Sequence, residues 1–221
     1  MMSIEIEFKE KHMEFKKNSN DWKQGVIKAL LKLLKEKDYY TYDHSRRVSK
    51  YALLLAREAQ LNEKDQEIVQ YSALFHDLGK IGISDSILLK PEKLSPIESQ
   101  MMQGHPVKGI EVINSIDDPF FQSLLPGIRN HHERFDGKGY PDQLKAEGIP
   151  LAARIILIID TFDAMTSTRP YRKGIDASIA YAELKKFSGT QFDKDLVDLF
   201  IKAHASWKGQ SLYSSLLKDI A

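Results

Sequence analysis

The sequence predicts an all-α fold, a single-domain helical bundle, and three observations lead to that prediction. Apolar residues recur at the three- and four-residue spacing of amphipathic helices through most of the chain. Helix-start signatures such as Ser95-Pro96-Ile97-Glu98 precede several of these segments. No internal repeat, low-complexity tract or interdomain linker separates them. We therefore expect one helical domain over residues 21–221, after a charged leader, residues 1–20, whose composition allows a strand, a frayed helix or disorder.

Six helices are expected in the first part of the chain, most of them with a recognisable start or stop. They run from Asp21; from an N-cap at Thr41 or Asp43 to about Gln60; from Asn62 to Gly79; from Ser95 to His105, where Pro106 kinks or restarts the chain; from Val107 to Ile116; and from Asp118 into His131.

The apolar stretch from Leu151 to Met165 needs a decision between strand and helix. Its run Ile155-Ile156-Leu157-Ile158-Ile159 is rich in β-branched residues, as buried strands are. The length of the stretch and its alanines favour a buried helix. Three further helices are expected over Ala177–Phe187, Asp193–Ser206 and Ser211–Ile220.

Composition limits the chemistry that the chain offers. Hydrophobic residues make up 42% of 221 positions, enough for a substantial core, and the formal net charge of +1 provides no overall field for DNA or an anionic membrane. No apolar run has signal-peptide or membrane-spanning length, so we expect a cytoplasmic protein. The chain has no cysteine, which leaves histidine and carboxylate as metal ligands and suits iron, manganese or zinc.

Histidines and aspartates gather at inward-facing or helix-end positions. Any one of them is readily explained as a hydrogen-bonded core residue or a helix cap, but it is harder to bury and satisfy all of them independently. As a group they match two metals that share a bridging carboxylate, for which Asp77 is the candidate. The predicted ligands are His44, His76, Asp77, His105, His131, His132 and Asp160, whereas His12 and His204 are interpreted as surface residues.

Three cations and one aromatic residue accompany these ligands. Lys80 follows Asp77 by one turn, and Arg169 and Arg172 follow the segment of Asp160, as expected of groups that bind phosphate. An ordinary solvated helix end explains each cation equally well. Tyr140 lies in the loop Asp136-Gly137-Lys138-Gly139-Tyr140-Pro141, whose glycines and proline end the preceding helix; it either packs the loop or hydrogen-bonds a ligand.

The order of these motifs resembles the HD-GYP family, a branch of the HD-domain metal-dependent phosphohydrolases. The matching residues are His44, His76-Asp77 with Lys80, Leu89-Lys90-Pro91, His105-Pro106, His131-His132-Glu133 through Pro141, Ile149-Pro150-Leu151, Asp160 with Asp163, Arg169-Pro170-Tyr171-Arg172 and Gln191-Phe192-Asp193. The resemblance covers about Thr41 to Ala205 and implies an HD-type helical bundle that carries a GYP loop.

The resemblance also implies a metal centre with two ions, iron first, with manganese or another transition metal as alternatives. His44, His76, Asp77 and Asp160 would hold one ion, and Asp77, His105, His131 and His132 the other, with a bridging hydroxide as nucleophile. Some family members with a third metal carry a glutamate at the offset of Tyr40, so we expect two metals here.

The activity implied is hydrolysis of cyclic di-GMP to linear pGpG, GMP or both, with Asp77 and Lys80 catalytic. Lys80, Tyr140, Arg169 and Arg172 would contact the substrate. Two alternatives stay open: a slow or inactive signalling module that binds a diguanylate cyclase (GGDEF) partner through the loop of Tyr140, and a phosphohydrolase of another cyclic dinucleotide or nucleotide. Because few residues precede the motifs, we expect regulatory input from elsewhere or from a homodimer.

Overall fold

The structure is a computed structural model that describes residues 21–168 and 173–207. Within those ranges the regular secondary structure is helical, and the one β-type pairing is an isolated bridge between Ser188 and Phe192. The all-α prediction is therefore confirmed. The chain divides into two compact units, residues 1–42 and 43–221, and each is described by itself. The predicted domain over residues 21–221 stays a prediction.

In the first unit, a helix covers residues 21–37 and the next helix, α2 (Tyr39–Glu58), begins after a single residue. That residue, Asp38, accepts hydrogen bonds from the backbone amides of Tyr40 and Thr41, both at 3.1 Å. Its carboxylate thus satisfies amides of the first turn that have no partner inside the helix. The predicted N-cap at Thr41 or Asp43 was wrong, because Asp38 caps the helix earlier.

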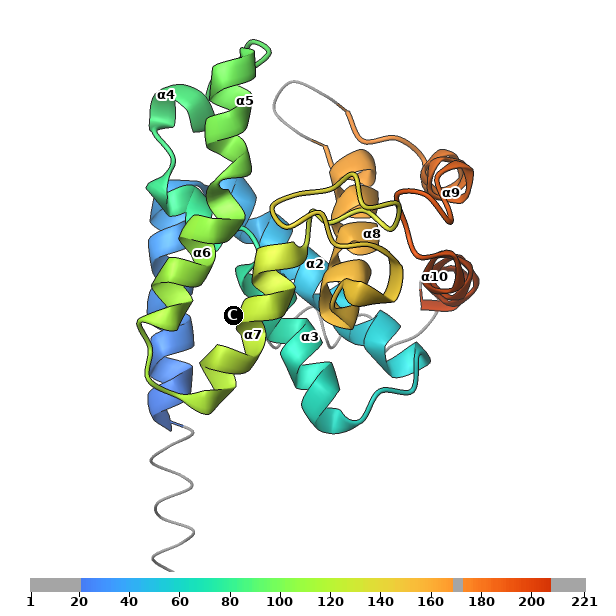
Figure 1. The fold of residues 1–221 in the computed structure, drawn as a ribbon, viewed down its shortest axis with the longest axis horizontal. Coiled ribbons are helices and arrows are strands. Elements are labelled where there is room, and N and C mark those ends of the chain that lie inside the picture. The colour runs from blue at the N-terminus through green and yellow to red at the C-terminus, as the bar shows by residue number, and fades with distance from the viewer. Residues whose placement is uncertain (1–20, 169–172, 208–221) are drawn as a thin grey trace, which may run out of the picture. The chain divides into compact units, whose positions relative to one another are not determined.

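The second unit continues α2 and adds the remaining elements, which Figure 1 shows from cyan to red. In chain order they are α3 (Glu63–Phe75), the 3-10 helix η1 (Leu78–Gly82), α4 (Asp85–Leu88), α5 (Pro96–Gln103), α6 (His105–Asn114), α7 (Pro119–Asn130), the 3-10 helix η2 (Ala146–Gly148), α8 (Leu151–Thr166), α9 (Ala177–Lys186) and α10 (Lys194–Trp207). The predicted helix at 211–220 lies outside the described residues.

Helix α8 is the central element of this unit. It contacts α3, α7, α9 and α10, and in Figure 1 it lies between α7 and the pair α9 and α10. The side chains of Ile155, Ile156, Ile158 and Ile159 are all fully buried and form one broad apolar face of the helix. A helix with so wide an apolar face packs that face into the core. The choice of helix over strand is confirmed.

Several predicted helix starts are also confirmed. Asn62 caps α3 through the amide of Asp65, Ser95 and Glu98 form a capping box on α5, and Asp118 caps α7. Pro106 occupies the first turn of α6, where its missing amide proton costs nothing, so the chain restarts there as predicted.

The predicted helix stop at Gly79 was wrong, because α3 ends at Phe75 and the chain continues into η1. Gly79 instead lies against α6. A Cβ atom there would stand 1.9 Å from the carbonyl oxygen of His105 and 2.5 Å from the amide nitrogen of Gly109. The absence of a side chain thus lets η1 and α6 pack backbone to backbone.

His204 was predicted to lie on the surface, and that prediction was wrong. It is 1% exposed and its ring packs against those of Tyr51, Phe162 and Phe200. Its Nδ1 atom lies 2.5 Å from the hydroxyl of Tyr181. An aromatic cluster with a hydroxyl partner therefore accommodates an imidazole that the sequence pattern placed in solvent. His12 lies outside the described residues.

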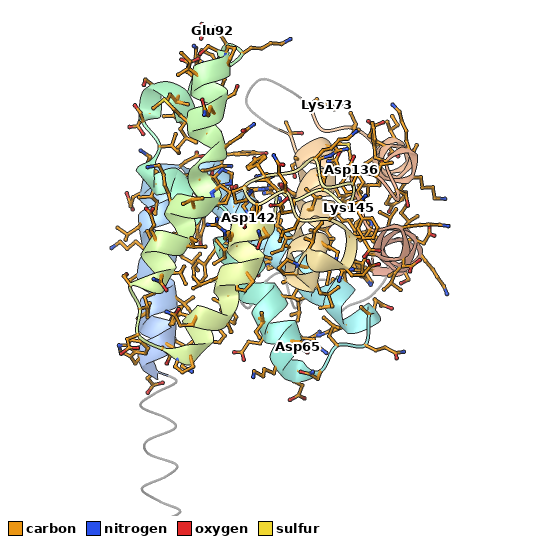
Figure 2. The ribbon with its side chains drawn as sticks, viewed as in Figure 1. Asp65, Glu92, Asp136, Asp142, Lys145 and Lys173 are labelled. Atoms are coloured by element: carbon orange, nitrogen blue, oxygen red, sulfur yellow. The ribbon has the colours of Figure 1, made fainter. Side chains whose placement is uncertain are left out.

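A loop joins α7 to α8 and contains the GYP sequence. Asp136, Asp142 and Lys145, which are labelled in Figure 2, are charged residues of this loop. Among the described residues, no helix has the length and apolar character needed to cross a membrane.

Candidate metal centre

The ends of three helices place histidines at one location. His76 follows the last residue of α3, His105 follows the C-cap of α5 and opens α6, and His131 is the C-cap of α7. A helix C-terminus carries a partial negative charge, which favours cations. His44 on α2 and Asp160 on α8 complete the surroundings.

One group of potential ligands comprises His44, His76 and Asp77, all buried, with ligand atoms within 4.8 Å of one another. The Nε2 atom of His76 lies 3.4 Å from Oδ2 of Asp77, and that of His44 lies 3.9 Å from the same oxygen. Asp160 joins the group, because its Oδ1 lies 3.0 Å from Nε2 of His44. Two imidazoles and two carboxylates therefore converge.

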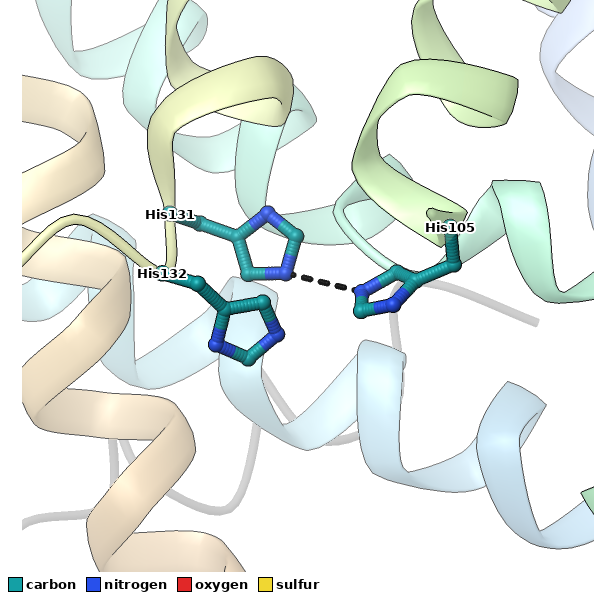
Figure 3. A group of neighbouring side chains, drawn as sticks. All are labelled: His105, His131 and His132. Carbon is teal, nitrogen blue, oxygen red and sulfur yellow. Dashed lines mark hydrogen bonds between the residues drawn. The ribbon is translucent and has the colours of Figure 1, made fainter. Parts of the chain in front are cut away.

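The other group comprises His105, His131 and His132, which Figure 3 shows with their rings turned toward one another. The Nε2 atoms of His105 and His131 are 3.1 Å apart. Asp77 reaches this group as well, since its Oδ1 lies 3.3 Å from Nε2 of His105. The two oxygens of Asp77 thus face the two groups, which is the arrangement that a bridging carboxylate requires.

Backbone carbonyls fix the rings of three histidines. The Nδ1 atom of His76 donates to the carbonyl of Ala73 at 2.7 Å, His105 donates to Met102 at 2.8 Å, and His131 donates to Ile128 at 2.7 Å. Each acceptor lies in the last turn of a helix, where carbonyls lack an intrahelical partner. Because Nδ1 carries the proton, the Nε2 lone pair of each ring is directed into the centre.

His44 is held differently, by the side chain of Asp163 on α8. Its Nδ1 donates to Oδ2 of Asp163 at 2.7 Å, and Nε of Arg47 donates to Oδ1 at 2.7 Å. Asp163 is 2% exposed. A carboxylate behind a ligating imidazole orients the ring and raises its basicity. Asp163 had no predicted role; its spacing of three residues from Asp160, on the same helix face, was the available signal.

Burial keeps the second histidine group neutral. It lowers the pKa of His105 to about 3 and that of His132 to about 4, and it holds the pKa of His131 well below the usual value. A neutral imidazole is the form that binds metal. These rings therefore offer lone pairs at any pH at which the protein is expected to work.

The group that contains His44, Asp77 and Asp160 carries more charge than the group of three histidines. Burial opposes a proton on His44, but hydrogen bonds to Asp160 and Asp163 outweigh it and raise the pKa to about 9. Burial also opposes ionisation of Asp77, yet the Lys80 ammonium at 2.7 Å helps to hold the pKa of that carboxyl well below its usual range. Buried carboxylates that remain ionised are typical of metal sites.

Two observations show that these residues suit metal ions. The buried Nε2 atom of His76 has no hydrogen-bond partner among the described residues. In addition, the Nε2 atoms of His105 and His131 face each other at 3.1 Å although both rings carry their proton on Nδ1. Two lone pairs at that distance repel each other, and a cation between them relieves the repulsion. The clusters could therefore bind metal.

A cavity of about 280 Å³ adjoins the centre, along one face of α8. It is large enough for part of a nucleotide, and it contacts both a histidine and a carboxylate of the centre. The lining residues are His132, Leu157, Asp160, Thr161, Ala164, Met165 and Gln191.

Of the four predicted substrate contacts, two lie beside the centre. Lys80 is bound to Oδ2 of Asp77 at 2.7 Å, at the edge of the centre, and Tyr140 stacks on the ring of His132. Arg169 and Arg172 lie outside the described residues.

Comparison with known proteins identifies related sequences. A family profile described as HD domain matches residues 28–196. The chain is 40% identical over 183 residues to the cyclic di-GMP phosphodiesterase response regulator RpfG of Xanthomonas campestris, covering 81% of this chain and 48% of the relative. It is 34% identical over 178 residues to the 3'3'-cGAMP-specific phosphodiesterase 3 of Vibrio cholerae, covering 80% and 38%. The chain thus spans about half or less of each relative.

Solved structures support the fold. The crystal structure of a cyclic GMP-AMP specific phosphodiesterase of Vibrio cholerae matches with a TM-score of 0.63 at 18% identity, over 87% of this chain and 52% of that one. At this identity the match concerns the helical architecture.

Proposed function

The chain belongs to the HD domain family, and we propose that it is a metal-dependent phosphodiesterase that hydrolyses cyclic di-GMP to linear pGpG, GMP or both. The main support is the position of Asp77, whose two oxygens face two separate groups of histidines, all buried except the half-buried His132. A phosphodiester needs charge neutralisation on both sides of the reacting phosphorus, and two neighbouring cations supply it.

Two metal ions are proposed, iron first and manganese or another transition metal as alternatives. One ion is assigned to His44, His76, Asp77 and Asp160, and the other to Asp77, His105, His131 and His132. When bound, the ions would lower the pKa of water and stabilise negative charge on the phosphate oxygens. Neutral nitrogen and carboxylate ligands without thiolate suit these metals.

The protein's own contribution is to hold the ligands and the substrate. Asp77 is proposed as the catalytic bridge and keeps the two groups at a fixed separation. Lys80 stands beside Asp77, with Nζ 2.7 Å from Oδ2 and 22% of its side chain exposed, so its positive charge lies at the edge of the centre where a phosphate would enter. We assign it to the scissile phosphate or the leaving oxygen.

Substrate recognition is proposed to extend from Lys80 along the cavity beside α8. The cavity's apolar side, Leu157, Ala164 and Met165, suits the face of a base, and Asp160 and His132 mark the end nearest the phosphate. Arg169 and Arg172 follow α8 in the sequence, and we keep them as proposed phosphate contacts, with Tyr140 as a proposed substrate contact in the loop that lines the site.

A second candidate substrate is a hybrid cyclic dinucleotide. The Vibrio cholerae relative is named as specific for 3'3'-cGAMP, and it covers nearly as much of this chain as the cyclic di-GMP enzyme does. The two substrates differ in one base, so the centre would treat their phosphates alike. A docking role of the loop toward a diguanylate cyclase, a homodimer and a cytoplasmic location remain further proposals.

The test is hydrolysis by the purified chain after anaerobic loading with iron or manganese. Cyclic di-GMP and 3'3'-cGAMP are supplied separately, and linear dinucleotides and mononucleotides are separated by chromatography. We expect turnover of cyclic di-GMP, lost in both His76→Ala and Asp77→Ala with helicity intact. The metal content of the wild-type protein should approach two ions per chain.

His204→Gln is the matched control, because His204 is as buried as His76 but lies among aromatic rings away from the centre. It should lose stability while retaining both metals and turnover. Full turnover in either ligand variant would contradict the assigned centre. Turnover of 3'3'-cGAMP alone would replace the first candidate substrate with the second.

A further inference from the structure

We propose that Tyr140 is a positioning residue that orients the His132 imidazole toward the metal centre by stacking on it. The inference rests on the proposed metal centre, and it deepens that proposal by assigning a role to the GYP loop. The loop's residues would then act through a ligand, independently of any contact with substrate or a partner protein.

His132 differs from the other four histidines of the centre in how its ring is held. His76, His105 and His131 each donate Nδ1–H to a backbone carbonyl, and His44 donates to Asp163. Such a bond selects the tautomer and fixes the ring plane. For His132, no hydrogen bond to a ring nitrogen is found among the described residues. Another contact must therefore limit rotation of this ring.

Tyr140 provides that contact. Its ring lies over the imidazole of His132 with the centroids 4.8 Å apart and the planes inclined by 26°, an offset-stacked arrangement. The ring of His131 also lies close to that of His132, with centroids 4.1 Å apart and planes tilted by 44°. The imidazole of His132 thus contacts two rings, and turning it out of plane would break the stacked contact with Tyr140.

The backbone of the loop holds Tyr140 in register with His132. The amide of Tyr140 donates to the carbonyl of His132 at 3.3 Å. The preceding residue, Gly139, is buried against the same segment: a Cβ atom there would stand 2.6 Å from the His132 carbonyl oxygen and 2.3 Å from the amide nitrogen of Arg134. Only glycine allows this approach, so the GYP sequence brings the tyrosine ring onto its neighbour.

The far end of the loop is anchored by Glu133, the residue after His132. Its carboxylate is 1% exposed and accepts from the amides of Asp142 at 2.6 Å and Leu144 at 3.1 Å. Asp142 is also bound by Arg129 and Asn130 at the end of α7. The loop is therefore tied on both sides of Tyr140 to the helix end that carries His132.

The test compares three variants by metal affinity, measured with Mn²⁺ by competition against a chelator. Tyr140→Phe keeps the stacked ring and removes the hydroxyl, whereas Tyr140→Leu keeps apolar volume and removes the ring. Tyr71→Leu is the control for loss of a tyrosine ring, because Tyr71 packs edge-on against the ring of Phe120, 5.2 Å away, and makes no ring contact with a predicted ligand among the described residues. Circular dichroism and thermal melting establish that each variant is folded.

We expect Tyr140→Leu to bind one of its two ions about 10- to 100-fold more weakly, the usual effect of removing a group that orients a ligand. Tyr140→Phe and Tyr71→Leu should retain wild-type affinity. Wild-type affinity in folded Tyr140→Leu would overturn the proposal. Equal loss in Tyr140→Phe would also overturn it, since that result assigns the role to the hydroxyl.

This readout separates the inference from the proposed function. If the metal-loaded wild type leaves cyclic dinucleotides intact while Tyr140→Leu still loses an ion, the proposed activity fails and the positioning role stands. If hydrolysis is observed and all three variants bind Mn²⁺ alike, the activity stands and the positioning role fails.

Discussion

Replacing Asp163 by asparagine tests how much the centre depends on the carboxylate behind His44. Asp163 accepts four hydrogen bonds: from His44 Nδ1 at 2.7 Å, from Arg47 at 2.7 and 3.0 Å, and from Ser167 Oγ at 3.1 Å. Asparagine has the same shape but no charge, and its NH₂ group would face donors at one of the two oxygen positions.

The expected loss of metal affinity follows from the loss of the charge-assisted hydrogen bond between Asp163 and His44. Such bonds contribute about 1.5–3 kcal/mol, and variants of this kind weaken metal binding by about 10- to 100-fold, or roughly 1.4–2.8 kcal/mol. The two figures agree. We therefore expect Asp163→Asn to bind the ion assigned to His44 about 10- to 100-fold less tightly than wild type, measured by chelator competition under anaerobic conditions.

Asp193→Asn is the matched control. Asp193 is also a buried carboxylate paired with an arginine, since Nη1 of Arg154 donates to it at 2.7 Å, and it accepts from the amides of Asp195 and Leu196. It should lose stability with no change in metal affinity. If folded Asp163→Asn binds metal like wild type, or if Asp193→Asn loses affinity equally, the orienting role of Asp163 is refuted.

Four other predictions concern the same region. Metal uptake at pH 7 should release a proton from His44, whose pKa of about 9 keeps it protonated without metal, so affinity should strengthen as pH rises toward 9; calorimetry in buffers of different ionisation enthalpy measures this. Lys80→Met should retain both metals but lose about 10²-fold or more in turnover, measured by product chromatography, since a positioned cation is removed. Gly139→Ala should lower both metal content and melting temperature, because its Cβ would meet backbone atoms within 2.6 Å; wild-type values would contradict the packing. Metal at 100 times its dissociation constant should raise the free energy of unfolding by about 2.7 kcal/mol, which a chelator reverses in denaturant titrations.

The sequence predicted the helices well because their signals are local. Capping residues such as Asn62 and Ser95 act within one turn, and the length of the segment around Ile155-Ile159 was enough to distinguish helix from strand. The HD-GYP resemblance is confirmed by the family match and by the relatives. The seven predicted ligand residues do meet in space, while their binding of metal remains a proposal.

What the sequence could not predict is which distant side chains become neighbours. Asp163 and His44 are 119 residues apart, and helical periodicity gives the face of each helix but not its partner. Gly79 resembled a helix stop, although its role depends on the backbone of α6. His204 was predicted on the surface because nothing local announces an aromatic cluster assembled from α2, α8 and α10.

The carbonyl acceptors behind His76, His105 and His131 have a consequence for how this family can diverge. Because the backbone makes these bonds, any side chain compatible with packing at Ala73, Met102 or Ile128 leaves the acceptor in place. Mutational drift there is harmless to ring orientation. His44 and His132 instead depend on the side chains of Asp163 and Tyr140. Substitutions at those two positions are therefore the simplest route by which related chains could acquire different metal affinities on the same helical frame.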